Sequence, residues 1–396
     1  DGYHGVIDVN VPLDSSILLE GPITDKASFL VAGRRSYFGE VLTAVIPNGT
    51  FDAFAAPVYY DYQSFVTWRP TDRDKLRFGV YGSGDRLKVL FADAPDGDPA
   101  IRAIELSLRF HRQQLGWDHQ FSQKLDHTMQ LSFGRTNQGL SAGPGARIDL
   151  TVNEPYLRSE WRYRALDKLQ ITLGTDTSLE SYAIRYTGPQ LGQDEGDNGQ
   201  GAFAQRPTLE VRDKGTRLFP AVYTELDIRP FAELRLVPGL RIDYFSDIGE
   251  FAVDPRGAVL YSFNEHWRVK AGMGLFSQPP RAPESARSVL GNPNLLPSRA
   301  IHYSAGVDHF FSEDLSLGLE GFYKSISQRV VVPDRSQDPR PFINDGIGRI
   351  YGLEVAGRKM ASGRWFGFLS YTLMRSERKD GDQPWRLFDF DQTHIS

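Results

Sequence analysis

The stretch Val269-Lys-Ala-Gly-Met-Gly-Leu-Phe-Ser-Gln-Pro-Pro-Arg-Ala-Pro283 predicts a β-strand with one apolar face and an abrupt end. Successive side chains of an extended chain point to opposite faces, so Val269 and Met273 share one face, whereas Lys270 and Gly272 share the other. The prolines that follow cannot donate a hydrogen bond to a strand ladder. The stretch therefore predicts a sheet that is apolar on one side, with a long loop at its edge.

The same alternation recurs along most of the chain. It is found in Thr128–Phe133, Leu169–Leu173, Leu234–Tyr244, Leu315–Gly321 and Tyr351–Val355. A longer strand is predicted over 102–121, where the apolar positions shift phase between Leu108 and Leu115. A one-residue insertion in a strand produces such a shift, so we predict a β-bulge near Arg112–Gln114.

The predicted connections alternate in length. Short turns are expected at residues 24–26, 71–75, 123–126, 166–168, 263–266 and 312–314, and long loops rich in Gly, Pro, Asp and Gln at 38–56, 85–101, 186–215, 277–298 and 331–347. Tight turns on one rim and long loops on the other are the layout of an outer-membrane β-barrel. A soluble sandwich would have short turns on both rims and strands of about five or six residues. A propeller would show a repeat of about 40 residues, and we find none.

Composition narrows the class further. The chain has 396 residues, a mean hydropathy of -0.38 and no apolar run of the length that a transmembrane helix needs, so any membrane contact is expected through strands. Aromatic residues make up 12%, which suits a protein with many side chains at a membrane interface. The absence of cysteine excludes disulfides and thiolate metal sites. The net charge of -5 argues against nucleic acid as a partner.

Charged residues in the predicted strands are expected to face away from lipid, because Arg or Lys facing lipid at mid-depth costs about 2–4 kcal/mol. The phase of each strand places Arg34, Arg69, Arg77, Arg241, Asp243, Lys270, Glu320 and Lys324 toward the inside. We take Arg34, Arg69, Arg77, Arg241, Asp243 and Lys270 as candidate ligand-binding residues. The alternative is that each of them belongs to a solvated wall and is neutralised by an ion pair.

Signatures of enzymes and metal sites are scarce. The eight histidines are scattered without HExxH spacing, and no GxSxG motif occurs, so we predict neither an enzyme nor a bound cofactor. The acidic segment Gln193–Gly201 could hold calcium through Asp194, Asp197 and Asn198, but it lacks the twelve-residue spacing of an EF-hand.

Four stretches in the same order as in one known family carry a resemblance. They are Ile17–Tyr37, Gly272–Pro280 with Gly291–Leu295, Asn344–Val355, and Leu369–Arg378 with Trp385–His394. Together they resemble the barrel domain of TonB-dependent outer-membrane receptors. The resemblance spans nearly the whole chain but does not specify a substrate.

The resemblance implies an all-β transmembrane antiparallel β-barrel in the bacterial outer membrane, of the plugged type with about 22 strands. Residues 1–396 are expected to form one incomplete barrel domain with about 17–18 of those strands, lacking the plug and the last strands. Its implied function is a receptor and transporter for a scarce nutrient, such as an iron chelate (a siderophore complex), cobalamin, a glycan or a peptide. Its implied partners are membrane lipid, the nutrient, and the TonB complex, the last through an N-terminal region missing from this chain.

Two other functions stay open at this point, an outer-membrane barrel hydrolase and an adhesive or structural barrel. Ligand capture is expected to involve loops 186–215 and 277–298, because binding residues concentrate on loops carried by a rigid scaffold. We also expect the strands around Val6 and Leu369 not to pair with each other.

The alternation makes a specific prediction about the two faces of the sheet. Leu131, Leu173, Leu236, Met273, Leu317 and Leu353 should point outward, and Arg77, Arg241, Lys270 and Glu320 inward.

Overall fold

The computed structural model describes residues 2–11, 13–45, 53–91, 103–143, 145–189, 208–287, 291–333, 340–360, 364–388 and 394–395. Strands dominate, and the only helices in these ranges are α1 (Phe38–Val45) and α2 (Ala282–Ser285). Neither of these described helices has the length and hydrophobicity to cross a membrane.

The chain forms two compact units. Unit 1 comprises Asp1–Ser159 and Asp176–Leu218, and unit 2 comprises Glu160–Thr175 and Phe219–Ser396. The strands β8 (Ala146–Leu166), β9 (Leu169–Pro189) and β10 (Thr208–Phe231) each contribute residues to both units.

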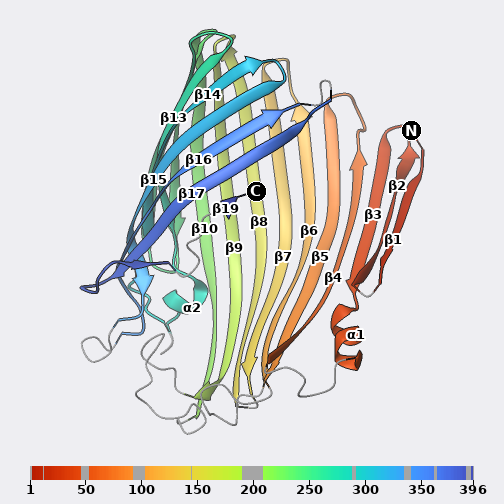
Figure 1. Cartoon of the computed structure of the whole chain (residues 1–396), viewed down its shortest axis with the longest axis vertical. Helices are drawn as coiled ribbons and strands as arrows, with labels where there is room; N and C mark the ends of the chain where they lie inside the picture. The colour runs from red at the N-terminus through yellow and green to blue at the C-terminus, as the bar shows by residue number, and fades with distance from the viewer. Residues whose placement is uncertain are drawn as a thin grey trace. The chain divides into compact units, whose positions relative to one another are not determined.

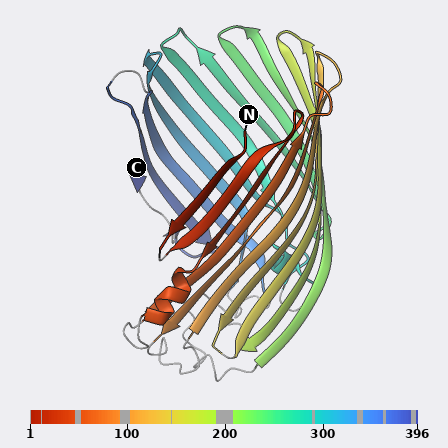
Figure 2. The same ribbon diagram turned by 90° about the vertical axis from the view of Figure 1, so that its right-hand side faces the viewer.

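Unit 1 is an antiparallel sheet of consecutive hairpins (Figures 1 and 2). Besides its parts of β8 to β10, it contains β1 (His4–Asn10), β2 (Asp14–Thr24), β3 (Ala27–Ser36), β4 (Ala53–Trp68), β5 (Asp74–Phe91), β6 (Ala103–Gln120) and β7 (Leu125–Ala142). Helix α1 follows β3 at the rim opposite the short turns that join β2 to β3 and β4 to β5 (Figure 2).

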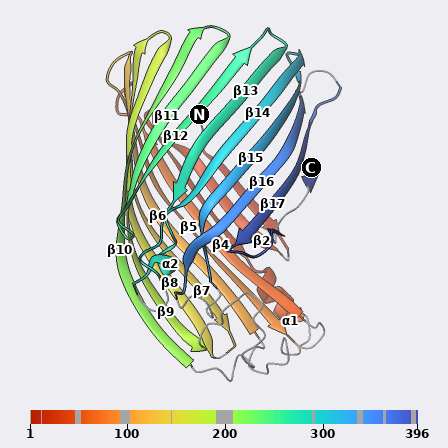
Figure 3. The ribbon, with the colours of Figure 1, turned by 90° about the vertical axis from the view of Figure 1, so that its left-hand side faces the viewer.

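Unit 2 continues the same plan (Figure 3). Its own strands are β11 (Leu234–Phe245), β12 (Glu250–Ser262), β13 (Trp267–Gln278), β14 (Ser298–Ser312), β15 (Leu315–Val331), β16 (Ile343–Lys359) and β17 (Gly367–Asp380), with the two-residue strands β18 (Arg386–Leu387) and β19 (His394–Ile395). The all-β antiparallel fold predicted from the sequence is therefore confirmed.

The register of the ladders fixes which side chains share a face, because directly paired residues lie on the same side of a sheet. We call the face of each unit that carries the predicted outward leucines the outer face, and the opposite one the inner face. In unit 1, Leu131 pairs with Leu115, whereas Arg77 pairs with Gly116 on the other face.

In unit 2, Lys270 pairs with Gly306, which pairs with Glu320, so both charges lie on the inner face. Met273 is three positions from Lys270, and Leu353 is one position from Glu354, which pairs with Glu320, so Met273 and Leu353 lie on the outer face. Leu173 follows the same rule, because the neighbouring Gly174 lies against the inner-face ring of Tyr223. The register therefore confirms that the predicted outward leucines and the predicted inward charges lie on opposite faces of each unit.

The predicted bulge near Arg112–Gln114 is wrong. Strand β6 pairs without a register shift from Ala103 to His119 on β5 and from Ile104 to Gln120 on β7. The apolar residues change face although the strand is regular, because the strand passes from one environment to another along its length. Near the short turns Leu115 lies on the outer face, and near the loops Leu108 lies on the inner face.

Strand also replaces part of the predicted long loops. Strands β5 to β10 are 18 to 24 residues long, and β5 extends to Phe91 through a stretch predicted as a loop. A β-strand needs about 9–11 residues to cross a membrane. The remaining residues extend the sheet at the loop rim, where the apolar side chains change from the outer to the inner face.

The connection after β13, predicted as a ligand-capture loop, is folded in its described part. Leu295 is 2% exposed, and the Asn292 amide donates to the carbonyl of Phe342 at 2.8 Å. The Asn344 amide donates to the carbonyls of Leu296 and Gln328. The first two of these bonds join the connection to β16 and to the residue before it, and the third joins β16 to β15.

Aromatic rings gather beside the short turns, where an interfacial girdle is expected. In unit 1 the His119 ring lies 5.4 Å from Trp117 and 4.3 Å from Phe121. In unit 2 the His309 ring lies 4.1 Å from Trp267 and 4.2 Å from Phe311. The turn rim of each unit therefore has the amphipathic side chains of a membrane boundary.

Among the described residues, β1 pairs with β2, and β17 pairs with β16, β18 and β19. The prediction that the strands around Val6 and Leu369 do not pair with each other concerns strands of different units and stays a prediction.

Candidate functional site

The inner face of unit 2 carries a charge cluster that spans three strands. Lys270 of β13 lies 2.9 Å from Glu320 of β15 and 3.5 Å from Asp308 of β14, measured between Nζ and a carboxylate oxygen. Gly306 of β14 lies between Lys270 and Glu320 in the ladder. A Cβ at this glycine would come within 2.9 Å of the Lys270 Cε, so the missing side chain is what lets the lysine cross β14.

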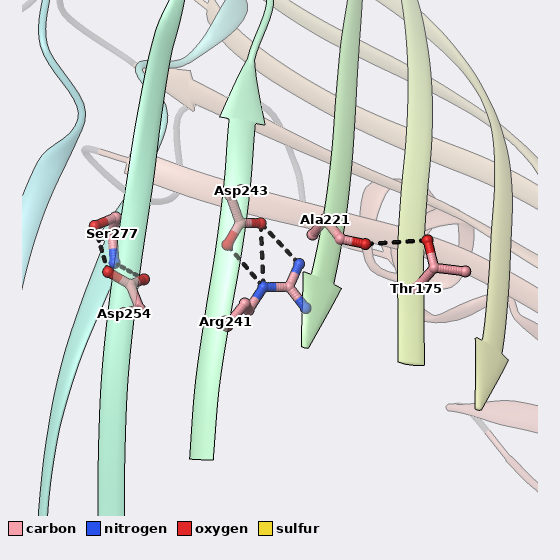
Figure 4. A network of polar contacts seen from close by, with 6 residues as sticks. All are labelled: Thr175, Ala221, Arg241, Asp243, Asp254 and Ser277. Carbon is pink, nitrogen blue, oxygen red and sulfur yellow. Dashed lines mark hydrogen bonds and ion pairs between the residues drawn. The ribbon is translucent and has the colours of Figure 1, made fainter. Parts of the chain in front are cut away.

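A second cluster lies on β11 and its neighbours (Figure 4). The Arg241 guanidinium donates to both oxygens of Asp243 at 2.8 Å, two residues along the same strand. It lies 6.0 Å from the ring of Tyr223, whose hydroxyl donates to Glu160 at 2.8 Å. The arginine is therefore held in place by a carboxylate on one side and an aromatic ring on the other.

Asp254 is 5% exposed and directly opposite Arg241 in the ladder, but its hydrogen bonds point the other way (Figure 4). It accepts from the backbone N–H and the hydroxyl of Ser277, both at 2.8 Å. Because Ser277 is the second-last residue of β13, this buried carboxylate holds the end of the strand from which the next connection leaves the sheet.

Between these clusters, the sheet has a hollow of about 460 Å³ lined by β10 to β16. Arg256 pairs with Gly274 in the ladder, and its guanidinium lies 6.0 Å from the ring of Phe276. Phe276 in turn lies 4.6 Å from the ring of His302. The hollow thus combines a cation, a phenyl ring and an imidazole on one face.

The charges that line this hollow are mixed. Arg256 and Lys324 are basic, and Glu225, Glu320 and Glu354 are acidic. Lys270 neutralises Glu320, whereas Glu354, directly opposite Glu320, has no ion-pair partner within the described residues. Like charges facing each other across a sheet are unfavourable, so this position favours a ligand or protein segment that brings a hydrogen-bond donor or a positive charge.

Five of the six predicted site residues lie on an inner face and form ion pairs. Arg34 pairs with Asp61 at 2.7 Å and Arg77 with Asp118 at 2.8 Å in unit 1, and Arg241, Asp243 and Lys270 belong to the clusters described above. Arg69 differs, because β4 ends at Trp68 and this arginine lies exposed in the turn. The structure brings together Arg241 with Asp243, but not Arg34 with Arg77.

The sequence prediction missed Arg256, Phe276, His302 and Glu354. Arg256 could have been found, because it is two residues after Asp254 and so shares the face of the predicted inward residues. Phe276 could not, since a phenylalanine in an alternating strand is normally assigned to lipid.

Within the described residues, no three His, Asp or Glu side chains come together as a metal site. The calcium hypothesis concerned Asp194, Asp197 and Asn198, which lie outside the described residues.

Comparison with known proteins gives a family. Residues 48–391 match the family described as TonB dependent receptor-like, beta-barrel. No curated protein matches the sequence.

Solved structures share the fold at low sequence identity. The siderophore receptor PirA from Pseudomonas aeruginosa superposes with a TM-score of 0.63 at 14% identity over 93% of this chain and 62% of its own. The outer membrane transporter YddB from Escherichia coli superposes with a TM-score of 0.66 at 10% identity, over 92% of this chain and 55% of its own. FauA from Bordetella pertussis, the alcaligin outer membrane receptor, superposes with a TM-score of 0.63 at 13% identity, over 98% of this chain and 62% of its own. The chain thus spans less than two thirds of each of these proteins.

Proposed function

This chain belongs to the TonB-dependent receptor β-barrel family, and we propose that it forms the barrel of a receptor that imports a ferric chelate. The family places the barrel in the bacterial outer membrane. We infer that import is driven by the TonB complex of the inner membrane and involves no enzymatic step. The ferric chelate is favoured over cobalamin, a glycan or a peptide because the similar structures PirA and FauA are described as siderophore and alcaligin receptors.

The observation that carries the proposal is the contrast between the two faces of unit 2. The outer face presents Met273, Leu317 and Leu353 to lipid, whereas the inner face carries the Lys270 and Arg241 clusters. A barrel with a purely structural role needs only polar side chains in contact with water on its inner face. Within the described residues, the hollow places the Arg256 cation and two rings beside the unpaired Glu354, which suits a ligand with flat groups, a negatively charged group toward Arg256 and a hydrogen-bond donor toward Glu354.

Uptake in cells tests the proposal. A strain that depends on this receptor is given radiolabelled ferric chelates. In a separate experiment the same strain is given labelled cobalamin. Import of at least one ferric chelate is expected, and import of cobalamin without any ferric chelate would replace the proposed cargo.

The hollow is tested by the double variant Arg256→Ala/Lys324→Ala. Each lost charged hydrogen bond is worth about 1.5–3 kcal/mol, so uptake at low chelate concentration should fall by at least about tenfold. The matched control Lys26→Ala/Arg73→Ala removes two exposed cations from short turns and should leave uptake unchanged. Equal uptake by both variants would remove the hollow from the transport path.

The predicted capture loop 186–215 needs a narrower deletion than its sequence bounds suggest. Residues 186–189 belong to β9, and β10 begins at Thr208, so removal of 190–207 spares both strands. We expect weaker chelate binding by cells that carry this deletion, with the amount of receptor in the outer membrane unchanged. Unaltered affinity would exclude this loop from capture.

A further inference from the structure

The hollow beside Arg256 on the inner face of unit 2 carries opposite charges at its two ends. Directly paired residues share a face, so the inner-face side chains of this sheet form rows that cross the strands. The row nearer the loops, which we call the loop-side row, contains Arg256, Gly274, His302 and Lys324. The row nearer the short turns, which we call the turn-side row, contains Lys270, Gly306, Glu320 and Glu354. A ligand in the hollow therefore meets both rows.

The space between the two rows is open. Lys324 and Glu320 are four residues apart on β15, and a strand rises about 3.3 Å per residue, so the rows lie about 13 Å apart. The row between them begins with the small residues Ala258, Gly272 and Ser304. A Cβ added at Gly272 would meet no atom closer than 3.6 Å. This floor therefore leaves room for an elongated ligand that reaches from one row to the other.

The loop-side row has more positive than negative charge. Within the described ranges, Arg256 and Lys324 form no ion pair, and each lies 6.0 Å from a phenyl ring, that of Phe276 and Phe322, respectively. The row continues through β11 to Glu225 on β10, its one carboxylate among the described residues. The two cations are therefore available to donate hydrogen bonds to negatively charged oxygen atoms of a ligand.

The turn-side row has too little positive charge. Lys270 lies 2.9 Å from Glu320 and is shared with a second carboxylate on β14. Arg268, the next cation of β13 toward the turn, lies 5.1 Å from the ring of Phe310. Glu354 is exposed, directly opposite Glu320, and without an ion-pair partner in the part of the chain that the structure describes. A positive charge brought to Glu354 would remove the repulsion between the two facing carboxylates.

We propose that the ferric chelate bound in this hollow carries a protonated amine, which Glu354 binds, while Arg256 and Lys324 donate to the oxygen atoms around the iron. A neutral donor such as a hydroxyl would satisfy one oxygen of Glu354 but would leave the repulsion from Glu320 in place. The amine and the iron centre lie at opposite ends of the chelate, because the two rows are about 13 Å apart. This inference rests on the proposed function and narrows its cargo.

The test compares ferric chelates that differ only at the amine. One pair is ferrioxamine B, a linear trihydroxamate with a free terminal amine, and its N-acetyl derivative. A second pair is a linear ferric tris-catecholate with a free or an acetylated terminal amine. Equilibrium binding of the radiolabelled chelates is measured on cells that carry the intact receptor and whose energy supply is blocked. In at least one pair the free amine should bind at least about tenfold more tightly, as expected for a hydrogen bond between charged groups.

The variant Glu354→Gln keeps the shape of the side chain and removes its charge. Its affinity for the free amine should fall about tenfold, to that for the acetylated chelate, whereas its affinity for the acetylated chelate should stay unchanged. The matched control Glu313→Gln removes an exposed carboxylate from the short turn between β14 and β15 and should keep the full preference. Unchanged gel migration of unheated samples checks that each barrel is folded.

Three outcomes would overturn the inference. If Glu354→Gln weakened both members of a pair equally, the carboxylate would hold a protein segment or the shape of the hollow, and not the amine. Equal binding of both members by the unaltered receptor would exclude the amine but leave the import of a ferric chelate intact. Failure of every ferric chelate to bind would overturn the proposed function as well.

Discussion

The two halves of strands β5 to β7 have opposite chemistry on the same unbroken ladder. In the half near the short turns, Phe78, Leu115 and Leu131 lie on the outer face, and Arg77, Gly116 and Gln130 on the inner face. In the half near the loops, Arg86, Ser107 and Gly139 lie on the outer face, and Leu87, Leu106 and Leu140 on the inner face. No register shift separates the two halves.

This difference shows that the surroundings of a strand, and not its pairing, decide which face is apolar. The turn-proximal half crosses the membrane, where lipid covers the outer face. The loop-proximal half extends beyond the membrane, where water covers the outer face and the apolar side chains turn inward. Sequence periodicity records only the apolar face, so a change of surroundings looks like an insertion in the strand.

The largest expected effect comes from placing one charge on the outer face of each half of β7. Leu131→Arg faces lipid and should lower the free energy of unfolding by about 2–4 kcal/mol. Ser141→Arg lies ten residues further along the same face, opposite Glu105, and should change it by less than about 0.5 kcal/mol. Equilibrium unfolding in lipid vesicles measures both.

The outcome for Ser141→Arg decides whether the comparison holds. A loss as large as that of Leu131→Arg would mean that the loop-proximal half also faces lipid, which would contradict the comparison. A third variant, Leu131→Ala, separates the cost of the charge from that of the missing leucine.

A smaller effect on the free energy of unfolding is expected from glycine substitutions on the two faces of unit 2. At Gly306, on the inner face, an added Cβ would meet the Leu319 carbonyl oxygen at 2.8 Å and the Lys270 Cε at 2.9 Å. We expect Gly306→Ala to lower the free energy of unfolding by about 1–3 kcal/mol, as overpacking does. It should also displace Lys270 from Glu320.

Gly321→Ala is the matched control, because the nearest atom to its added Cβ is 3.9 Å away. This variant should be neutral or stabilise by about 0.5 kcal/mol, since alanine loses less conformational freedom than glycine in a strand. If both alanines had the same effect, the glycine would not be what opens the path of Lys270 across β14.

Much of the fold could be predicted from the sequence because the membrane-crossing halves obey a period of two. The faces of Leu131, Arg77, Lys270 and Glu320 followed from that period alone. The loop-proximal halves could not be predicted, since Gly82–Lys88 has the composition of a loop and is strand only because its neighbours on β4 and β6 pair with it.

The site was less predictable, because ion pairs join residues that are distant in sequence. Nothing near Lys270 in the sequence indicates that Glu320 is its partner, 50 positions away. Only the position of Gly306 in the ladder makes that contact possible.

The smallest expected effect concerns the short turn at the start of β5, outside the part of the strand that crosses the membrane. Asp74, the first residue of β5, accepts hydrogen bonds from the Thr71 hydroxyl at 2.5 Å and the Trp117 indole at 3.0 Å, and lies 2.7 Å from the His119 ring. These partners, Thr71 first, lower the pKa of Asp74 from its ordinary value of 3.8 to about 2. A lowered pKa in the folded state means that the ionised carboxylate stabilises the fold fully above about pH 4, and that this contribution is lost as the pH falls toward 2.

We therefore expect Asp74→Asn to be less stable than the unaltered protein at pH 6, with the difference shrinking between pH 4 and pH 2. Unfolding by urea at a series of pH values measures it. The control Asp72→Asn removes a carboxylate from the same turn that accepts no hydrogen bond within the described residues, and its profile should follow that of the unaltered protein. A difference for Asp74→Asn that stays constant down to pH 2 would mean that the asparagine disturbs the turn by its shape. The ionised carboxylate would then contribute nothing specific to this rim, and the turn-proximal half would owe its stability to lipid contact and its ladders alone.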